Sequence, residues 1–276
     1  MACDMKFESN IVSANDFLTN YYNIKDMMGN KIGMLDFKEW KLQEFGPTCI
    51  VSKKMSSDIM KPNLFVIPDI SNDSFYSTMK IIQMVENRLT SYHMIYVINW
   101  CYKDDVIKEF HISFTEKTDD IKSDDRTVKY NPMIEFMKNS AKLLNHVIKN
   151  DLKLNNVHLL AKNIGAGIAI QLLPIDPIYT GLFLSSPSSP LNVCNFIELT
   201  AMPQNRLRNI KFRFAWNIDN EYIESWGESS LHERESYDKI MSLFARRCGT
   251  LDYISRYYDK GFGREIHPDF ICDIIH

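Results

Sequence analysis

The clearest chemical signal in this sequence is a tight turn between an apolar strand-like run and an apolar helix-like run. Val157–Ala161 reads VHLLA, three turn residues follow, and Gly165–Leu173 reads GAGIAIQLL. A turn of this kind commonly presents either backbone N–H groups that bind a phosphate or a nucleophilic side chain. Asn163 stands at the tip. Its neutral carboxamide is not a nucleophile. The turn therefore has the shape of a reactive turn but lacks a nucleophilic side chain.

One interpretation of the turn is a dinucleotide-binding fingerprint. Gly165, Ala166 and Gly167 resemble the start of GxGxxG, in which backbone amides approach a pyrophosphate. The third small position falls on Ile170, whose branched side chain would hold the helix away from the strand. Where a carboxylate should meet the ribose, about twenty residues further on, the chain reads LFLSS. Both departures weigh against a nucleotide cofactor.

A second interpretation is the nucleophile elbow of the α/β-hydrolase fold, which has the pattern small–x–nucleophile–x–small. Residues Ala161–Gly165, called the elbow below, fit this pattern with Asn163 at the centre. Small residues flank the centre because larger ones would collide in so tight a turn, and Gly167 adds a small position where the helix meets the strand. We expect Asn163 to have a positive φ, a conformation in which asparagine is enriched.

The rest of the chain contains the acid and the histidine that an elbow requires, in the order used by this fold. Asp219 follows the strand-like run KFRFAWN, and His267 opens a terminal helix that begins HPDFI. On these residues the chain resembles the α/β-hydrolases from about Leu64 to the C-terminus. HPDFI is similar to the histidine loop of lipase-type members, and LFVIPDISND with HMIYVINW is similar to the polyester-synthase branch. The resemblance implies that His267 reaches Asn163 and that Asp219 holds His267.

Two departures from the working pattern predict a site without catalysis. Ser, Cys or Asp at the elbow can form a covalent intermediate, whereas histidine cannot usefully deprotonate the carboxamide of Asn163 near neutral pH. The resemblance also places the oxyanion-hole positions at Asp69, Ile70 and Ile164. Relatives often have His-Gly after the first core strand, and here the carboxylate of Asp69 would repel a developing oxyanion if it pointed inward.

Other reactive residue types in the chain have plainer explanations. We expect Lys162 to be solvated, and His93 and His158 to lie at the edges of the core. Cys101 and Ser185–Ser186 follow strand ends but lie in no elbow, so we do not expect either to be a nucleophile. The six cysteines have no CxxC spacing, which argues against disulfides and a zinc site. We expect no metal and no cofactor.

Alternating strand-like and helix-like runs predict one α/β-hydrolase-like domain over residues 1–276, with a mostly parallel, doubly wound sheet and helices on both faces. The predicted strands are 64–69, 93–100, 157–161, 181–186, 210–219 and 251–258, and the predicted helices are 79–89, 131–152, 165–173 and 236–246. Residues 1–60 are less regular, with an N-terminal helix and edge strands in 33–45 and 47–55. The stretch 186–210 leaves room for a small cap or none.

The charge balance limits the partners of the protein. With 32 basic and 35 acidic residues the net charge is -3, and no basic stripe indicates nucleic acid or a membrane surface. The start lacks a secretory pattern and no apolar run reaches the length of a membrane span, so we expect an intracellular, cytoplasmic protein. An oligomer is compatible with these features.

Three hypotheses for the function follow from these residues. The first is a catalytically inactive α/β-hydrolase scaffold retained to bind a protein or a small-molecule ligand. The second is an active hydrolase of ester-like bonds, in which Asp219 and His267 activate water directly or Asn163 is converted to another group. The third is a nucleotide-binding protein.

Overall fold

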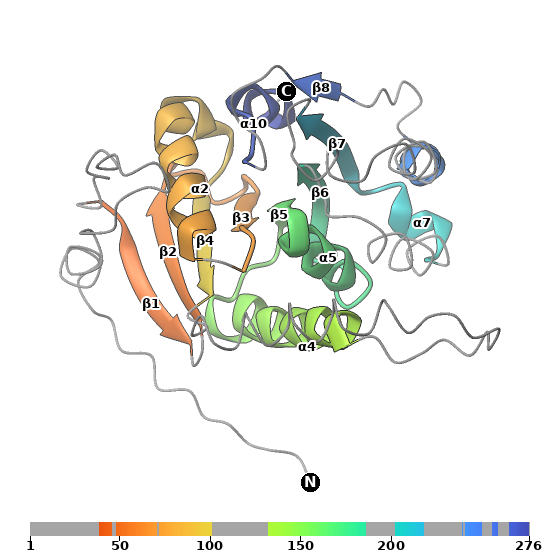
Figure 1. Cartoon of the computed structure of the whole chain (residues 1–276), viewed down its shortest axis with the longest axis horizontal. Coiled ribbons are helices and arrows are strands. Elements are labelled where there is room, and N and C mark those ends of the chain that lie inside the picture. The colour runs from red at the N-terminus through yellow and green to blue at the C-terminus, as the bar shows by residue number, and fades with distance from the viewer. Residues whose placement is uncertain are drawn as a thin grey trace, which may run out of the picture.

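A computed structural model describes residues 39–45, 48–70, 72–100, 132–185, 202–217, 239, 241–249, 256–258 and 265–275. The described strands form an eight-stranded sheet in the order β1-β2-β4-β3-β5-β6-β7-β8 (Figure 1). The strands are β1 (Lys41–Phe45), β2 (Thr48–Lys54), β3 (Asn63–Ile67), β4 (Met94–Trp100), β5 (Val157–Lys162), β6 (Tyr179–Ser185), β7 (Lys211–Asn217) and β8 (Arg256–Tyr258).

The sheet is antiparallel at one edge and parallel elsewhere. β1 pairs with β2, and β2 pairs with β4, in antiparallel register, with Val51 opposite Leu42 on one side and Val97 on the other. From β4 to β8 each strand is parallel to its neighbour. The predicted antiparallel edge and the mostly parallel sheet are therefore both confirmed.

Helices follow the strands along the chain. They are α2 (Asn72–Val85), α4 (Pro132–His146), α5 (Asn163–Leu172), α7 (Gln204–Leu207) and α10 (Pro268–Ile275), with a 3-10 helix η1 (Glu86–Ser91) and a π-helical turn η2 (Val147–Asp151). Residues 239 and 241–247 are also helical, as predicted for 236–246. The helix expected over 79–89 is longer and ends in a 3-10 turn. Pro132 opens α4, where the missing N–H of proline costs no hydrogen bond.

The two faces of the sheet bury two separate hydrophobic clusters. Phe65 and Ile67 of β3 pack into the cluster that contains α4, α5 and the helical residues 241–247. Leu64 and Val66 point to the other face and pack into the cluster that contains α2 and α10. Because successive side chains of a strand point to opposite faces, this alternation places helices on both faces, as predicted.

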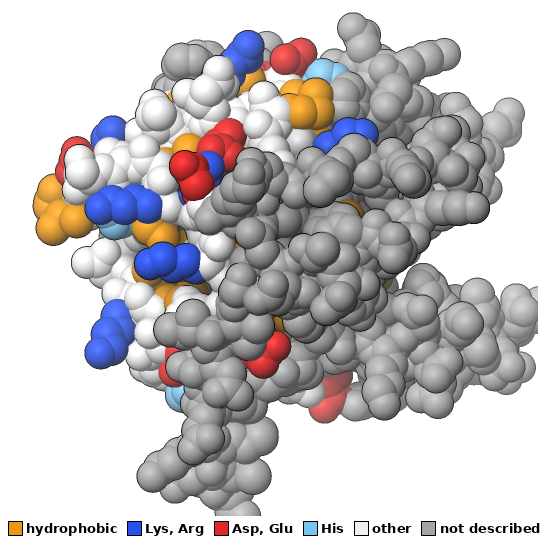
Figure 2. All heavy atoms as spheres, turned by 90° about the vertical axis from the view of Figure 1, so that its left-hand side faces the viewer, with side chains coloured by type: hydrophobic (Ala, Val, Ile, Leu, Met, Phe, Trp, Pro, Cys, Tyr) orange, Lys and Arg blue, Asp and Glu red, His pale blue; other side chains and the backbone are white. Residues whose placement is uncertain are grey.

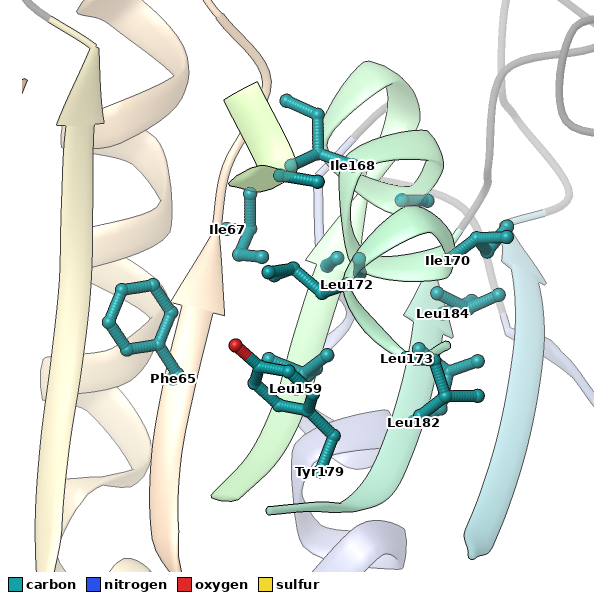
Figure 3. Packing of buried hydrophobic residues seen from close by; sticks show 14 of the residues in the cluster. Phe65, Ile67, Leu159, Ile168, Ile170, Leu172, Leu173, Tyr179, Leu182 and Leu184 are labelled. Carbon is teal, nitrogen blue, oxygen red and sulfur yellow. The ribbon is translucent and has the colours of Figure 1, made fainter. Parts of the chain in front are cut away.

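Helix α5 is buried on nearly all sides, which fixes its position relative to the sheet. Every residue of α5 except Ile164 is buried. Its side chains pack against those of β3, β5 and β6, as Figure 3 shows for Ile168, Ile170 and Leu172 beside the strand residues. On its other side it packs against α4. A helix in such surroundings must be apolar all round, as the sequence of α5 is.

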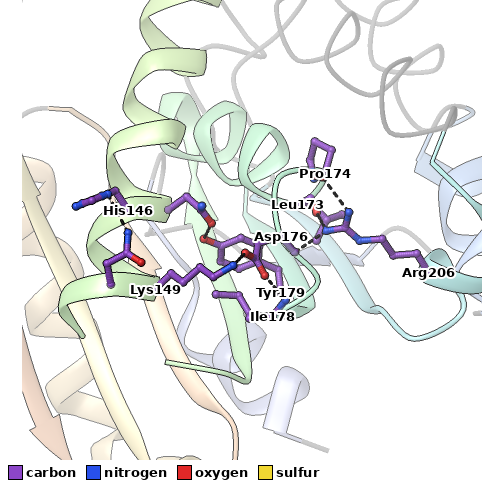
Figure 4. Close-up of polar contacts among 10 residues, drawn as sticks. His146, Lys149, Leu173, Pro174, Asp176, Ile178, Tyr179 and Arg206 are labelled. Atoms are coloured by element: carbon purple, nitrogen blue, oxygen red, sulfur yellow. Dashed lines mark hydrogen bonds and ion pairs between the residues drawn. The ribbon is translucent and has the colours of Figure 1, made fainter. Parts of the chain in front are cut away.

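Polar contacts anchor the chain just beyond the C-terminal end of α5 (Figure 4). Arg206 of α7 donates to the backbone carbonyls of Leu173, Pro174 and Asp176. The carboxylate of Asp176 accepts from Lys149 of η2 at 2.5 Å. The C-terminal end of α5 is therefore held by η2 on one side and by α7 on the other. The candidate site lies at the opposite end, in the first turn of α5.

The described surface carries mixed charge. Basic, acidic and hydrophobic side chains are interspersed over the described part of the face seen in Figure 2. Among the described residues, the large hydrophobic side chains that are exposed are Ile59, Met60, Met84, Ile175 and Leu243. Within the described ranges, no helix has the length and apolar character needed to cross a membrane.

Candidate functional site

The elbow is an abrupt junction between a strand and a helix. β5 ends at Lys162, whose backbone is extended, and α5 begins at Asn163 with no loop residue between them. Asn163 has a φ of 48°, and the only other non-glycine residue with positive φ in the described part of the chain is Lys153. The predicted strand-to-helix turn and the positive φ of Asn163 are confirmed.

Gly165 is required by the closeness of α5 to the end of β3. A Cβ atom at this position would lie 2.4 Å from the backbone oxygens of both Ile67 and Pro68, which is well inside van der Waals contact. On the other flank Ala161 is fully buried in the sheet. The small residues on each side of Asn163 therefore have the steric reason that the sequence pattern indicates.

The side chain of Asn163 is buried and only partly satisfied. The residue is 2% exposed, and its Nδ2 donates to Oδ2 of Asp69 at 3.4 Å. Its Oδ1 has no hydrogen-bond partner among the described residues. A buried amide oxygen without a hydrogen-bond donor destabilises the folded state. A donor to Oδ1 of Asn163 would therefore be favoured.

Asp69 lies two residues beyond the end of β3, beside the first turn of α5. Its Oδ1 accepts the backbone N–H of Ile70 at 2.9 Å, and its own backbone N–H donates to Oγ of Ser74 in α2 at 2.9 Å. Burial raises the pKa of the Asp69 carboxyl, and the Ile70 N–H, Lys162 and Asn163 partly oppose this rise. The carboxylate points toward the side chain of Asn163, as the hydrogen bond between them requires.

Lys162 is buried, and the expectation that it would be solvated is wrong. The side chain is 1% exposed and forms an ion pair with Glu265, whose side chain is 29% exposed. Burial lowers the pKa of Lys162, while Glu265 and Asp69 raise it. The error has a physical reason: β5 lies between β3 and β6 in the middle of the sheet, where both faces of a parallel strand are covered.

His267 stands directly before α10, in the loop where the sequence places it. Its Nδ1 accepts the backbone N–H of Asp269 at 3.1 Å, and its carbonyl accepts the N–H of Phe270 at 3.0 Å. These contacts give His267 a capping role at the start of α10. The predicted hydrogen bond between Asn163 and His267 is not formed, because Nδ2 of Asn163 donates to Asp69 and its Oδ1 has no partner among the described residues. Asp219 lies outside the described residues, so its contact with His267 stays a prediction.

The comparisons with known proteins give structural matches only. No protein-family model and no curated protein matches the sequence. The siderophore hydrolase EstB from Aspergillus nidulans is similar in structure, with a TM-score of 0.50 over 89% of this chain and 94% of that chain, at 12% sequence identity. This chain has the α/β-hydrolase fold.

Further solved structures match at lower TM-scores. The siderophore hydrolase EstA from Aspergillus nidulans has a TM-score of 0.47 and 12% identity, and covers 83% of this chain and 88% of its own. A CIB-like hydrolase from Thermoplasma acidophilum has a TM-score of 0.46 and 12% identity, and covers 85% of this chain and 95% of its own.

Within the α/β-hydrolase fold, the β5–α5 junction accounts for the glycines better than a dinucleotide site does. Ile170, which takes the third small position of the fingerprint, is 1% exposed and packs in the core. A phosphate at the first turn of α5 would also meet the carboxylate of Asp69. A carboxylate beside the first turn of α5 therefore disfavours the anion that a helix N-terminus binds in dinucleotide sites.

The remaining candidate residues lie in strands of the sheet or outside the described residues. His158 of β5 packs edge-on between the rings of Tyr92 and Phe183, and burial lowers its pKa to about 4, which fits its expected place at the edge of the core. Ser185 is buried within β6, whereas Cys101 and Ser186 fall outside the described residues.

The sequence interpretation missed two contacts that shape the site. One is the ion pair of Lys162 with Glu265, and the other is the hydrogen bond of Ser74 with the backbone of Asp69. A signal for the first was present, because a lysine at the end of the apolar run of β5, directly before Asn163, must be buried if the strand is central. The second had no signal, since a serine in a polar stretch commonly caps a helix.

Proposed function

We propose that this protein is a catalytically inactive member of the α/β-hydrolase fold that uses the elbow to bind a ligand. One observation carries the proposal: the carboxylate of Asp69 lies at the amide of Asn163 and accepts the N–H of Ile70. The place where a working hydrolase has a nucleophile and an oxyanion hole is filled by an amide–carboxylate pair.

The elbow residue itself supports the loss of catalysis. The lone pair of the amide nitrogen is delocalised, so Asn163 has no group comparable to a hydroxyl, thiol or carboxylate that attacks an acyl carbon. Its Nδ2 is also committed as a donor to Asp69. Asparagine keeps the positive φ of the turn at low strain, so the shape persists while the nucleophile is absent.

The oxyanion positions support the same conclusion. An oxyanion hole needs N–H donors aimed at the place where negative charge develops. The N–H of Ile70 donates instead to the carboxylate of Asp69 at 2.9 Å. A second negative charge beside that carboxylate would be repelled, so the transition state of acyl transfer gains no stabilisation from this side of the elbow.

The test is hydrolysis by the purified full chain. A panel of short-chain esters should show no turnover above that of Asn163→Ala, and a fluorophosphonate probe should not label the protein, because no activated nucleophile is present. Asn163→Ser alone should stay inactive, since Asp69 remains. Asn163→Ser combined with Asp69→Gly tests whether the carboxylate is the remaining obstacle.

Turnover by the wild-type protein that is lost in His267→Ala would contradict the proposal. It would support the alternative of an active hydrolase in which Asp219 and His267 activate water. Mass spectrometry of aged protein should also find Asn163 unchanged, because the branched Ile164 disfavours ring closure through its backbone nitrogen. A gain of about one dalton at Asn163 that disappears in His267→Ala would show a competent histidine.

A further inference from the structure

The elbow presents acceptors where a working hydrolase presents donors. Oδ1 of Asn163 is buried and has no donor among the described residues. The adjacent carboxylate of Asp69 accepts one hydrogen bond at each oxygen, from Ile70 and from Asn163. An ionised carboxylate offers about four lone-pair sites, so Asp69 can accept further donors.

The negative charge of Asp69 has no ion-pair partner in the described part of the chain. Its two donors, the N–H of Ile70 and the amide of Asn163, are neutral. Lys162 acts on Asp69 through space, but its ammonium is ion-paired with Glu265. A half-buried carboxylate without a counter-ion has lost part of its hydration, so a cation bound beside it would be favoured.

The orientation of the Asn163 amide follows from this pairing. A carboxylate can only accept, so the amide must turn its nitrogen toward Asp69 and its oxygen away. The positive φ at the strand-to-helix junction fixes the backbone of Asn163. The hydrogen bond from the backbone N–H of Asp69 to Oγ of Ser74 in α2 helps to fix Asp69. The unpartnered oxygen is therefore held in place before any ligand arrives.

We propose that the elbow binds its ligand through a cationic donor group, a primary ammonium or a guanidinium, which donates to Oδ1 of Asn163 and compensates the charge of Asp69. This inference rests on the proposed function, because it names the ligand class of the same site. Asp69 and Glu265 are half-buried rather than fully buried, so the acidic side of the site is open to solvent within the described residues. Anions, including the carboxylate product of an esterase, are disfavoured there.

The binding experiment uses four probes of similar size: n-butylammonium, n-butylguanidinium, butyrate and n-butanol. Each is titrated into the full chain while the side-chain amide resonances of Asn163 are followed by NMR. We expect both cations to shift these resonances with dissociation constants of about 1 mM, the scale for a small fragment with one anchoring group. Butyrate and n-butanol should bind at least ten-fold more weakly.

Three variants connect the binding to the named atoms. Asp69→Asn removes the charge and should weaken cation binding at least ten-fold. Asn163→Gly tolerates the positive φ but removes the acceptor oxygen, and should weaken it similarly when binding is followed by calorimetry. Asp151→Asn removes one exposed negative charge at the end of η2 and should leave the affinity unchanged. Thermal unfolding checks that each variant is folded.

Three results overturn the inference. They are butyrate binding as tight as that of the cations, equal cation binding by the wild type and folded Asp69→Asn, or no cation binding at concentrations up to about 50 mM. The outcome is separable from that of the proposed function. Ester hydrolysis would contradict the inactive site, whereas an inactive protein that binds no cation would contradict only the ligand class.

Discussion

At the scale of single residues, the burial of Lys162 sets the electrostatics of the elbow. The side chain of Lys162 is almost completely removed from water, whereas the side chain of Glu265 is 29% exposed. The free-energy cost of removing one member of the ion pair therefore depends on which charge is left unpaired. A buried charge left without its partner is strongly destabilising, and a partly hydrated one is less so.

This difference predicts unequal costs for the two halves of the pair. Glu265→Gln should lower the free energy of unfolding by about 3 kcal/mol, because it leaves the ammonium of Lys162 buried beside Asp69 alone. Lys162→Met should lower it by only about 1 kcal/mol, because a thioether of similar length fills the space and Glu265 can be hydrated. Urea unfolding of both variants at pH 7 measures the two values, and a larger loss for Lys162→Met would contradict the assignment.

At the scale of elements, the contact between the first turn of α5 and the end of β3 determines the shape of the elbow. Gly165 allows the helix to approach the carbonyls of Ile67 and Pro68, and this approach brings Asn163 to Asp69. Pro68 has no N–H to continue the pairing of β3, so the strand ends there and the chain turns toward α2. The site exists because two element ends meet.

The same substitution at two glycines separates this steric requirement from backbone preference. Gly165→Ala should lower the free energy of unfolding by about 3 kcal/mol, because its Cβ would collide with rigid backbone atoms. Gly249→Ala should cost about 1 kcal/mol, because that glycine has a φ of 81° but open space around its Cβ. Chemical denaturation compares them, and equal losses would show that α5 can shift without cost.

At the scale of the whole molecule, the two faces of the sheet depend on a tightly packed central strand. His158 of β5 shows this, because its ring lies between those of Tyr92 and Phe183, and a Cβ at Gly181 would lie 2.7 Å from it. Burial, with a smaller effect from the charge of Lys211, lowers the pKa of His158 from 6.5 to about 4. The folded molecule therefore binds the proton less readily than the unfolded chain.

The stability of the whole molecule should consequently fall as the pH falls from 6.5 toward 4. The unfolded chain takes up a proton at His158 in this range and the folded state does not, which amounts to about 3 kcal/mol. Asp69, whose pKa is raised, works in the opposite direction. The difference in unfolding free energy between wild type and His158→Leu isolates the histidine. This difference should shrink on acidification from pH 6.5 toward 4, and a difference that stays constant would contradict the burial of His158.

The sequence by itself determined the features that repeat along the chain or follow from local backbone demands. Alternating apolar runs indicated a mostly parallel sheet with helices on both faces, and the run 33–55 indicated the antiparallel edge. The small residues around Asn163 indicated its strand-to-helix turn and positive φ, because few residue types tolerate that conformation. Residues 1–38, 101–131, 186–201 and 218–238 lie outside the described residues, so the N-terminal helix, the small cap, the single domain and Asp219 stay predictions.

Only the tertiary structure decided which side chains meet at the elbow. Asp69 and Asn163 are distant in the chain, and whether the carboxylate points inward depends on how β3 ends against α5. Lys162 reads as a solvated residue in sequence because its charge suggests water, yet its place in a central strand leaves it only Glu265 and Asp69 as nearby carboxylates among the described residues. Periodicity reports which face a residue occupies, whereas the partner on that face comes from another part of the chain, and no local pattern encodes it.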